Sequence, residues 1–290
     1  MLIQTLITGL SIGGIYALMA VGYSLIFSIL NFSNFAYGSI IMLGAYISYF
    51  TCVKMGMSIS LALILSILGA AALCYLNEKL AYGPLRKRKA SSLYFMISAM
   101  GTSIFLENLV YATIGARFYS FPQQFAKTNL EFMGTSVGML DLFAIIFAFV
   151  AIYGLHFFLQ KSKTGIAIRA ASYDIQVCEL NGINTAKLIG LVFLLAGALA
   201  GISGMFLGMK YMVYPTMGWI TNKAYIAAVI GGLGSLPGAV VGGIVLGVLE
   251  TFVSAYVSST VRDVFSFSLL VVLLMFMPTG LFGKYLEEKV

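Results

Sequence analysis

Charged residues are scarce in this chain of 290 residues. Lys, Arg, Asp and Glu make up 9% of it, whereas about 25% is usual for a soluble domain. Apolar and aromatic residues make up 60%. The 17 basic and 10 acidic side chains are too few to cover a water-facing surface of this size, and such apolar composition is the opposite of that of disordered chains. The composition therefore excludes a soluble globular enzyme and a disordered chain.

Residues that carry chemistry are also few. The three cysteines and the single histidine, His156, show no metal-ligand spacing, and a zinc site needs three or four clustered ligands. No G-x-x-x-x-G-K-[ST] phosphate loop is present, so we expect no ATP binding by this chain itself. Gly232 and Gly234 resemble the start of a dinucleotide motif, but Pro237 takes the place of the third glycine. The sequence predicts no catalytic residue, no metal site and no cofactor held by this chain.

Long runs without any charge dominate the sequence instead. The first charged residue is Lys54, and later charge-free runs cover 55–77, 90–106, 142–160, 188–209, 224–249 and 264–283. Most match the 17–25 residues that a membrane-crossing helix needs. Because lipid offers no hydrogen-bond partners, continuous apolar runs of this length must be helices. The 53-residue opening is long enough for two helices, interrupted by polar residues at 31–34, and lacks the basic start of a cleaved signal.

These runs predict an all-α, polytopic transmembrane bundle that forms a single domain over 1–290. We expect eight full spans, among them 5–29, 35–53, 58–80, 91–113 and 139–160, plus a short segment at 223–234. A helix of twelve residues reaches only about 18 Å. The short segment is therefore predicted to be a broken or re-entrant piece, buried in protein or lining a cavity.

The basic residues predict the orientation, because basic loops stay in the cytoplasm. Two clusters, Lys79 with 86–89 and the segment 161–187, are separated by two spans and can both be cytoplasmic. Counting back places the N-terminus outside. If 223–234 crosses, the tail residues Lys284 and Lys289 lie inside and the basic residues divide 11 inside to 6 outside. We therefore expect a multi-pass protein of a bacterial inner membrane with a cytoplasmic C-terminus.

Two acidic residues fall within predicted spans, where burial of a charge is costly unless it faces a partner or a cavity. Glu107 lies in a run from Ile104 to Leu109, and Glu250 follows the apolar run 224–249. Each could brace neighbouring helices through hydrogen bonds, or could take part in a solute path or its gate, and both interpretations stay open. Asp141 and Asp263 lie at predicted span ends and are expected to be interfacial.

The segment between two spans at about 161–187 is the most informative. It reads Lys163-Thr-Gly165-Ile-Ala-Ile-Arg169-Ala-Ala-Ser-Tyr-Asp174, followed by Cys178 and Gly182-Ile183-Asn184. Residues 166–180 can form one short amphipathic helix that ends at Gly182, and a solvated loop is the alternative that the residues alone leave open. This pattern resembles the cytoplasmic coupling loop of ABC importer permeases of the branched-chain amino-acid type, in which the loop contacts an ATPase.

Five further motifs in the same order resemble that family over almost the whole chain. They begin at Asn31-Phe-Ser-Asn34-Phe-Ala-Tyr37-Gly38, Gly101-Thr-Ser-Ile-Phe-Leu-Glu107-Asn108, Tyr214-Pro215, Gly231-Gly232-Leu-Gly234 and Leu249-Glu250. The glutamate-bearing end resembles the H-type (LivH) subunit. Tyr37 replaces the usual His, Glu107 stands where Gln is common, and Cys178 takes the place of an Ala. The first two departures put the identity of the substrate in doubt.

The resemblance implies a permease subunit that catalyses no covalent step. It would pair with a second, related permease subunit as a heterodimer, within membrane lipid and without nucleic acid. Two cytoplasmic ATPase subunits would bind ATP-Mg, and an extracytoplasmic binding protein would deliver branched-chain or related amino acids. The residues expected to couple to the ATPase are Arg169, Asp174, Gly182 and Ile183. Those expected in the translocation path or its gate are Asn34, Tyr37, Glu107, Asn108, Gly232, Gly234 and Glu250.

Alternatives remain open at this point. The substrate could be urea or a short amide, because the binding protein largely sets specificity. An ion-coupled secondary transporter would need charged residues along its path, and only Glu107 and Glu250 are available within the spans. A channel would require a filter motif or a ring-forming charge pattern, and neither is apparent.

Overall fold

The computed structural model describes residues 2–122, 129–132 and 135–283. The expected cytoplasmic tail with Lys284 and Lys289 lies outside these residues. The α-helices are α1 (Leu2–Leu30), α2 (Tyr37–Tyr49), α3 (Ile59–Asn77), α4 (Gly83–Lys87), α5 (Ser92–Thr113), α6 (Met139–Lys161), α7 (Lys163–Tyr173), α8 (Ile175–Leu180), α9 (Thr185–Lys210), α10 (Thr221–Gly231), α11 (Leu236–Tyr256) and α12 (Val261–Phe276). The strands β1 (Asn129–Phe132) and β2 (Thr135–Gly138) pair antiparallel, with Asn129 opposite Gly138.

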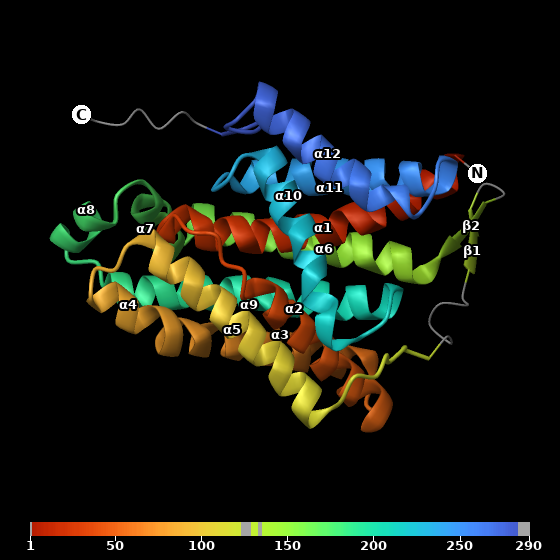
Figure 1. The fold of residues 1–290 in the computed structure, drawn as a ribbon, viewed down its shortest axis with the longest axis horizontal. Helices are drawn as coiled ribbons and strands as arrows, with labels where there is room; N and C mark the ends of the chain where they lie inside the picture. Colours follow the sequence, from red (N-terminus) through yellow and green to blue (C-terminus); the bar gives the residue numbers. More distant parts are fainter. Residues whose placement is uncertain (1, 123–128, 133–134, 284–290) are drawn as a thin grey trace.

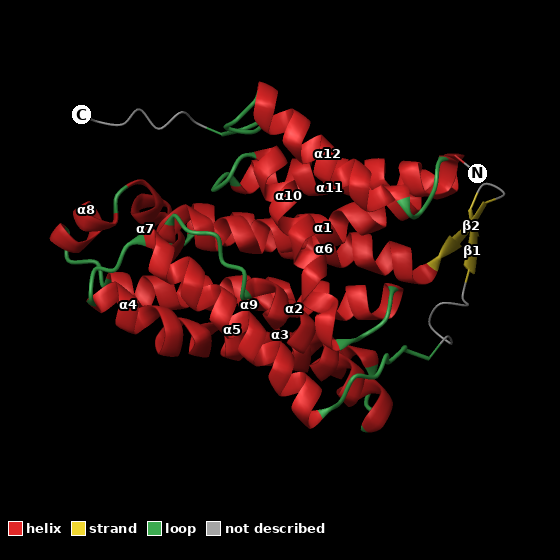
Figure 2. Cartoon of the chain, in the orientation of Figure 1, coloured by secondary structure: helices red, strands yellow, loops and turns green. Residues whose placement is uncertain are grey.

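The long helices form a bundle whose elements run roughly along its long axis, with α1 in the middle (Figures 1 and 2). Six helical segments in the described chain are long and apolar enough to cross a membrane: Leu2–Leu30, Ile59–Lys87, Ser92–Thr113, Met139–Lys161, Thr185–Lys210 and Leu236–Tyr256. The expected helical membrane architecture is therefore confirmed, with the short hairpin of β1 and β2 as an addition, but eight full spans are not confirmed. The expected span 35–53 contains the shorter helix α2, and the charge-free run 264–283 overlaps the shorter helix α12.

The first shortening has a local cause in the segment 31–36, which is not helical. The chain turns back into the bundle after α1 (Figure 1), and Asn34 is 1% exposed there. Its Oδ1 accepts hydrogen bonds from the Tyr82 hydroxyl at 2.7 Å and from the Ala36 amide at 3.2 Å. These bonds satisfy part of an open backbone that lipid could not solvate, and α2 can start within the bundle.

A second interruption surrounds α10, in the place where a short broken segment is expected. The 3₁₀ helix Pro215–Ile220 leads into α10, which has 11 residues. The turn after α10 contains Gly232, with φ of +102°, a conformation that suits glycine alone. After α12, the amides of Leu281 and Phe282 donate to the carbonyls of Ile230 and Gly231 at 2.9 and 3.0 Å. The end of α10 is therefore held by the chain that follows α12.

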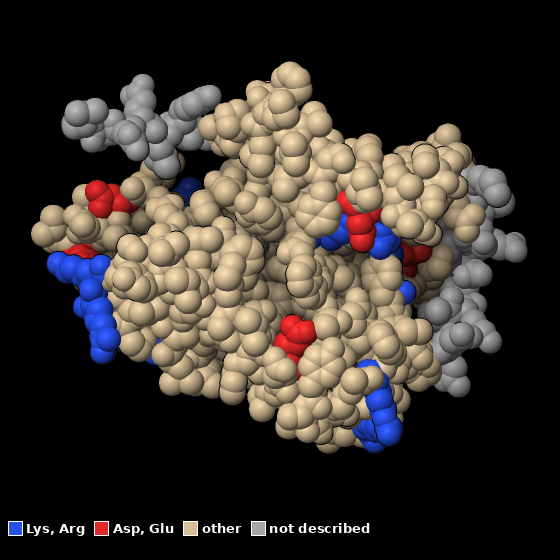
Figure 3. All heavy atoms as spheres, viewed as in Figure 1, with Lys and Arg blue, Asp and Glu red and all other residues tan. Residues whose placement is uncertain are grey.

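The two ends of the bundle differ in character. Helices α4, α7 and α8 lie at one end, and the start of α1 lies with β1 and β2 at the other (Figure 1). On the face shown in Figure 3, charged atoms are few and wide areas carry none. Exposed apolar side chains cover the outward sides of α5 and α6, as in Ile104, Phe105, Phe149 and Tyr153. Such surfaces suit lipid or a second membrane subunit.

Candidate solute path and coupling surface

A buried polar cluster surrounds Glu250 on α11. Glu250 is 1% exposed and Lys223, near the start of α10, is 7% exposed. The Lys223 ammonium donates to Glu250 Oε1 at 2.5 Å, to Asp263 Oδ1 at 3.0 Å and to Ser266 Oγ at 3.2 Å. Ser266 also donates to Glu250 Oε1. The cluster therefore ties α10, α11 and the first two turns of α12 together.

Close packing of α1 against α11 brings a further donor to Glu250. A Cβ at Gly243 or Gly247 would collide with the backbone of Ala17 or Gly13, so the two helices touch through their backbones, an approach that small residues allow in membranes. Glu250 lies one turn after Gly247 on α11, and the Tyr16 hydroxyl of α1 donates a hydrogen bond to Glu250 Oε2 at 3.0 Å. Both oxygens of this buried carboxylate thus have partners.

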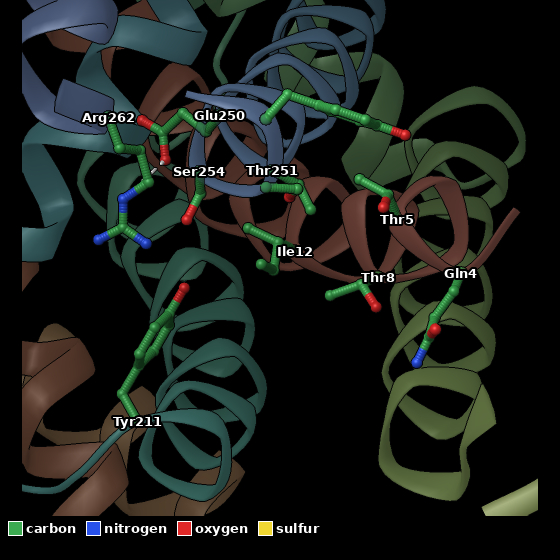
Figure 4. Close-up of a pocket in the computed structure, with 11 residues that line it drawn as sticks. Gln4, Thr5, Thr8, Ile12, Tyr211, Glu250, Thr251, Ser254 and Arg262 are labelled. Carbon is green, nitrogen blue, oxygen red and sulfur yellow. Dashed lines mark ion pairs between the residues drawn. The ribbon is translucent and has the colours of Figure 1, made fainter. Parts of the chain in front are cut away.

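Next to the cluster lies a cavity of about 490 Å³. Arg262, from the first turn of α12, has its Nε 3.9 Å from Glu250 Oε2 and 3.5 Å from Asp263 Oδ1. Its terminal nitrogens point toward the cavity, as do the hydroxyls of Ser254 and Tyr211 (Figure 4). Tyr211 follows α9, and burial raises the pKa of its hydroxyl, which Arg262 partly offsets. The hydroxyl therefore stays protonated at neutral pH and can donate a hydrogen bond.

The path residues expected near the N-terminus have structural partners. Asn34 braces the break before α2, as described above. Tyr37 is fully buried, and its hydroxyl donates to the carbonyl of Ala196 on α9 at 3.0 Å. The same hydroxyl occupies the space where a Cβ on Gly22 would lie. These two residues lie together at the α1–α2 break, where they hold a non-helical segment inside the bundle.

The other expected path residues lie elsewhere. Glu107 is half-buried on α5 and forms no hydrogen bond or ion pair with the residues that the structure describes. Asn108 is exposed, and its side-chain amide donates to the carbonyl of Ile104 at 2.8 Å. Gly232 and Gly234 form the turn between α10 and α11, both with positive φ. Figure 1 shows α5 and α11 on opposite sides of α1, so Glu107 and Glu250 belong to different sites.

The segment expected to couple contains two helices where one was predicted over 166–180. Asp174 adopts an extended conformation (φ −157°, ψ 110°), which ends α7, and its Oδ1 accepts from the amides of Gln176 and Val177 at 2.8 and 3.0 Å. It is thus the N-cap of α8. Gly182, with φ of +78°, ends α8, and the Ile183 amide donates to the Cys178 carbonyl at 3.0 Å. The single-helix prediction was wrong because the Asp174 cap outweighs the continuous helix pattern.

The exposed side chains of this segment are partly apolar. Tyr173 is 79% exposed and Leu180 is 87% exposed, while Arg169 is also exposed. Gly165 packs α7 onto the end of α6, since a Cβ there would lie 2.5 Å from the Leu159 Cα. The segment therefore presents a fixed surface with apolar and basic groups at one end of the bundle.

Sequence reasoning singled out Glu250 but missed its partners. Lys223 and Arg262 are 27 and 12 positions away from it in the sequence, and both were counted only among the six basic residues expected outside. The available signal was three neighbouring polar positions, 262, 263 and 266, at the start of an otherwise apolar run, which share one side of a helix. Among the described residues, no group of three or more His, Cys, Asp and Glu could hold a metal ion.

Comparisons with known proteins agree on one family. The model of the family "branched-chain amino acid transport system, permease component" matches residues 5–277. The permease LivH of the high-affinity branched-chain amino acid transport system is 37% identical in Salmonella typhimurium and in Escherichia coli, over 99% of this chain and 97% of each relative. BraD of Pseudomonas aeruginosa is 35% identical over 99% and 98%. No solved structure matches this chain.

Proposed function

Because this chain belongs to the family of branched-chain amino acid transport permeases, we propose that it is one membrane half of an ATP-driven amino-acid importer. It is a multi-pass membrane protein whose homologues are transport permeases and not enzymes. Relatives named for branched-chain amino acid transport cover almost the whole chain, which favours leucine, isoleucine or valine as the solute over urea or a short amide.

The observation that carries the ATP-driven proposal is the surface of α7 and α8. These helices lie beyond the long helices at one end of the bundle (Figure 1), where exposed apolar groups such as Tyr173 and Leu180 would face water. Large exposed apolar side chains at such a place mark a protein–protein contact. We assign this surface to a cytoplasmic ATPase, with Arg169 and Ile183 beside it and with Asp174 and Gly182 setting its shape. ATP-Mg would be bound by the two ATPase subunits.

An ATPase on this surface would also imply the orientation of the chain in the membrane. Basic residues 86 and 87 end α4, and basic residues 88 and 89 follow it, at the same end of the bundle as α7 and α8 (Figure 1). Basic loops stay cytoplasmic. The start of α1 is then outside, together with the cavity near Glu250. An extracytoplasmic binding protein would deliver its solute to this outer end.

Alternating access would use the two interruptions in the bundle. The start of α2 packs on the 3₁₀ helix before α10. The contact is close: a Cβ on Gly218 would lie 3.3 Å from the carbonyl carbon of Gly38. Non-helical backbone is tolerated at membrane depth where it is buried or lines a cavity. We therefore propose that Asn34, Tyr37, Gly232, Gly234 and Glu250 support or form the gates.

The half-buried carboxylate of Glu107 favours a second permease subunit. A carboxylate within a membrane helix is costly unless a polar partner or water reaches it, and Asn108 beside it is exposed. We propose that the side of α5 that carries Glu107 and Asn108 faces the path between this chain and a related, different permease subunit.

Reconstituted uptake tests the proposed function. The chain is combined with its permease partner, the two ATPases and the binding protein in proteoliposomes, and labelled leucine uptake is followed. We expect uptake that requires ATP on the ATPase side and is unaffected when proton and sodium gradients are collapsed. Leucine uptake that is driven by an ion gradient without ATP would contradict the proposal and favour a secondary transporter. Uptake of labelled urea or acetamide, without leucine uptake, would show that the substrate is urea or a short amide and not leucine.

A further inference from the structure

The cavity beside Glu250 opens at the end of the bundle where α1 begins, opposite α7 and α8 (Figures 1 and 4). One wall is formed by the first three turns of α1, another by the last two turns of α11, and Arg262 and Tyr211 close the third side. Its volume of about 490 Å³ falls within the range of small-molecule sites. A single amino acid fits into a space of this size.

Arg262 and Lys223 differ in how far their charges are satisfied. The Lys223 ammonium has three oxygen partners within 3.2 Å, which use all of its donors. Arg262 approaches the carboxylates of Glu250 and Asp263 only through Nε, at 3.9 and 3.5 Å. The guanidinium carbon lies 6.0 Å from the centroid of the Tyr211 ring, and its terminal nitrogens point toward the Tyr211 hydroxyl at the edge of the cavity (Figure 4). A guanidinium fork turned in this way is the group that binds a carboxylate through two parallel hydrogen bonds.

The surroundings of Arg262 suit a carboxylate that belongs to a molecule without net charge. Lys223 and Arg262 balance Glu250 and Asp263, so the cluster itself is neutral and attracts no strongly charged ligand. The hydroxyls of Ser254 and Tyr211 point to the same space as the guanidinium (Figure 4), and both can donate to a carboxylate oxygen.

The far part of the cavity is suited to an apolar side chain. It is lined by Ile12 and Ala255, by Thr5 and Thr8 of α1, whose methyl groups offer apolar contacts, and by Gln4 and Thr251. Apolar walls with a few placed polar groups are the usual form of a small-ligand site. The cavity thus combines a carboxylate-binding head with a largely apolar body.

We propose that this cavity is a binding site for an α-amino acid with an apolar side chain, held by its carboxylate on Arg262, at the outer end of the permease. The inference rests on the proposed function and names the part of this chain that first receives the solute. The hydroxyls of Ser254 and Tyr211 complete the carboxylate site. The side chain of the amino acid lies against α1.

A ligand series on the unaltered transporter tests the carboxylate requirement. The complete complex, in nanodiscs and without the binding protein, is equilibrated with labelled leucine. Unlabelled 4-methylpentanoate, which lacks only the ammonium group, should compete for the site. The analogue 3-methylbutylamine, which lacks the carboxylate, should compete at least tenfold more weakly than 4-methylpentanoate. Equal competition by the two analogues, or no saturable leucine binding by this complex, would overturn the proposal.

Variants then test the residues. Arg262→Gln should weaken leucine binding by about ten- to one-hundred-fold, the range for a lost charge-assisted pair, and Ser254→Ala should weaken it by a smaller factor without touching the ion pairs. Arg117→Gln is the matched control, because Arg117 is an exposed arginine that follows α5 toward the same end of the bundle, and its binding should equal that of the unaltered complex. Unchanged leucine binding by Arg262→Gln would overturn the assignment, and unchanged binding by Ser254→Ala alone would remove Ser254 from the carboxylate site.

ATP-dependent leucine uptake by the unaltered complex with its binding protein tests the proposed function separately. Absence of that uptake contradicts the transport proposal itself. Normal uptake by the unaltered complex, together with normal leucine binding by Arg262→Gln, contradicts only the cavity. If Arg262→Gln instead lowers the affinity for the empty binding protein and leaves leucine binding unchanged, the cavity is part of a docking surface and the amino-acid site is refuted.

Discussion

The ion pair between Lys223 and Glu250 supports a prediction with a clear sign. We consider Lys223→Met, which removes the ammonium but keeps a flexible side chain of similar length. Glu250 is 1% exposed, and the next cationic group, the Arg262 guanidinium, lies 3.9 Å from it through Nε. The substitution therefore leaves a buried carboxylate with hydroxyl partners but without a cation in hydrogen-bond contact.

The expected cost follows from the geometry. Two unit charges at 2.5 Å attract by about 7 kcal/mol at an effective dielectric constant of about 20, and most of this gain offsets the cost of removing both charges from water. Removal of one partner from a buried pair costs about 3–5 kcal/mol. Because Tyr16 and Ser266 still donate to Glu250, we expect a value near the lower end, about 3 kcal/mol.

The reverse substitution, Glu250→Gln, should cost less. Lys223 keeps Asp263 at 3.0 Å and Ser266 at 3.2 Å, so its charge remains paired, and we expect a loss of about 1–2 kcal/mol. The double variant Lys223→Met/Glu250→Gln should lie closer to Glu250→Gln than to the sum of the two, with a coupling energy of about 2–3 kcal/mol.

Unfolding of the purified chain in mixed detergent micelles, followed by loss of the helical circular dichroism signal, measures these differences. Lys54→Met is the control, because Lys54 is exposed at the end of a π-helical turn and should leave the free energy of unfolding unchanged. A cost below about 1 kcal/mol for Lys223→Met, or a larger cost for Glu250→Gln than for Lys223→Met, would refute the reasoning that Glu250 depends on this one cation.

Three further predictions concern helix packing and the coupling segment. Gly201→Ala should destabilise the chain by about 1–3 kcal/mol, because the added Cβ would lie 2.5 Å from the Ser66 carbonyl oxygen. Gly101→Ala, at a position with open space around it, should be neutral or slightly stabilising in the same unfolding assay. Gly182→Val should lower the ratio of leucine taken up to ATP hydrolysed in proteoliposomes, while Gly182→Asn, which tolerates a positive φ, should keep it; equal ratios would remove Gly182 from coupling. Asp174→Ala should cost about 0.5–2 kcal/mol through the lost N-cap, and unchanged hydrogen exchange at the Gln176 amide would contradict this.

Charge distribution along the sequence predicted the long helices well, because the cost of placing charge in lipid acts on every span independently of tertiary structure. The charge-free run 142–160 lies within α6, and 188–209 lies within α9. The same signal fails at α2. There the start of the helix depends on the Tyr82 hydroxyl, 48 positions away, which holds Asn34 inside the bundle. Hydropathy carries no information about such a bond.

The candidate site was predictable only in part for the same reason. Glu250 stood out because a carboxylate beside a membrane-length apolar run requires an explanation. Its pairing with Lys223 arises from the packing of α10 on α11, and Arg262 approaches it only because α12 folds back after Tyr256. The Asp174 cap, by contrast, is local: an Asp followed by three helix-compatible residues is an N-cap signal, and it could have divided the predicted coupling helix in two.

The contacts of α10 indicate which parts of the molecule can move together. At its start, Lys223 binds Asp263 and Ser266 of α12, and at its end the carbonyls of Ile230 and Gly231 accept from the chain that follows α12. This short helix is thus held at both ends by one neighbour, so a tilt of α10 must carry α12 with it. Glu250 lies on α11, whose backbone packs on α1 through Gly13 and Gly247. Because α11 also packs on α10, where a Cβ on Gly242 would collide with the Ala227 carbonyl oxygen, the Lys223–Glu250 pair lies inside one packed unit of α1, α10, α11 and the start of α12. We therefore expect these helices to move together.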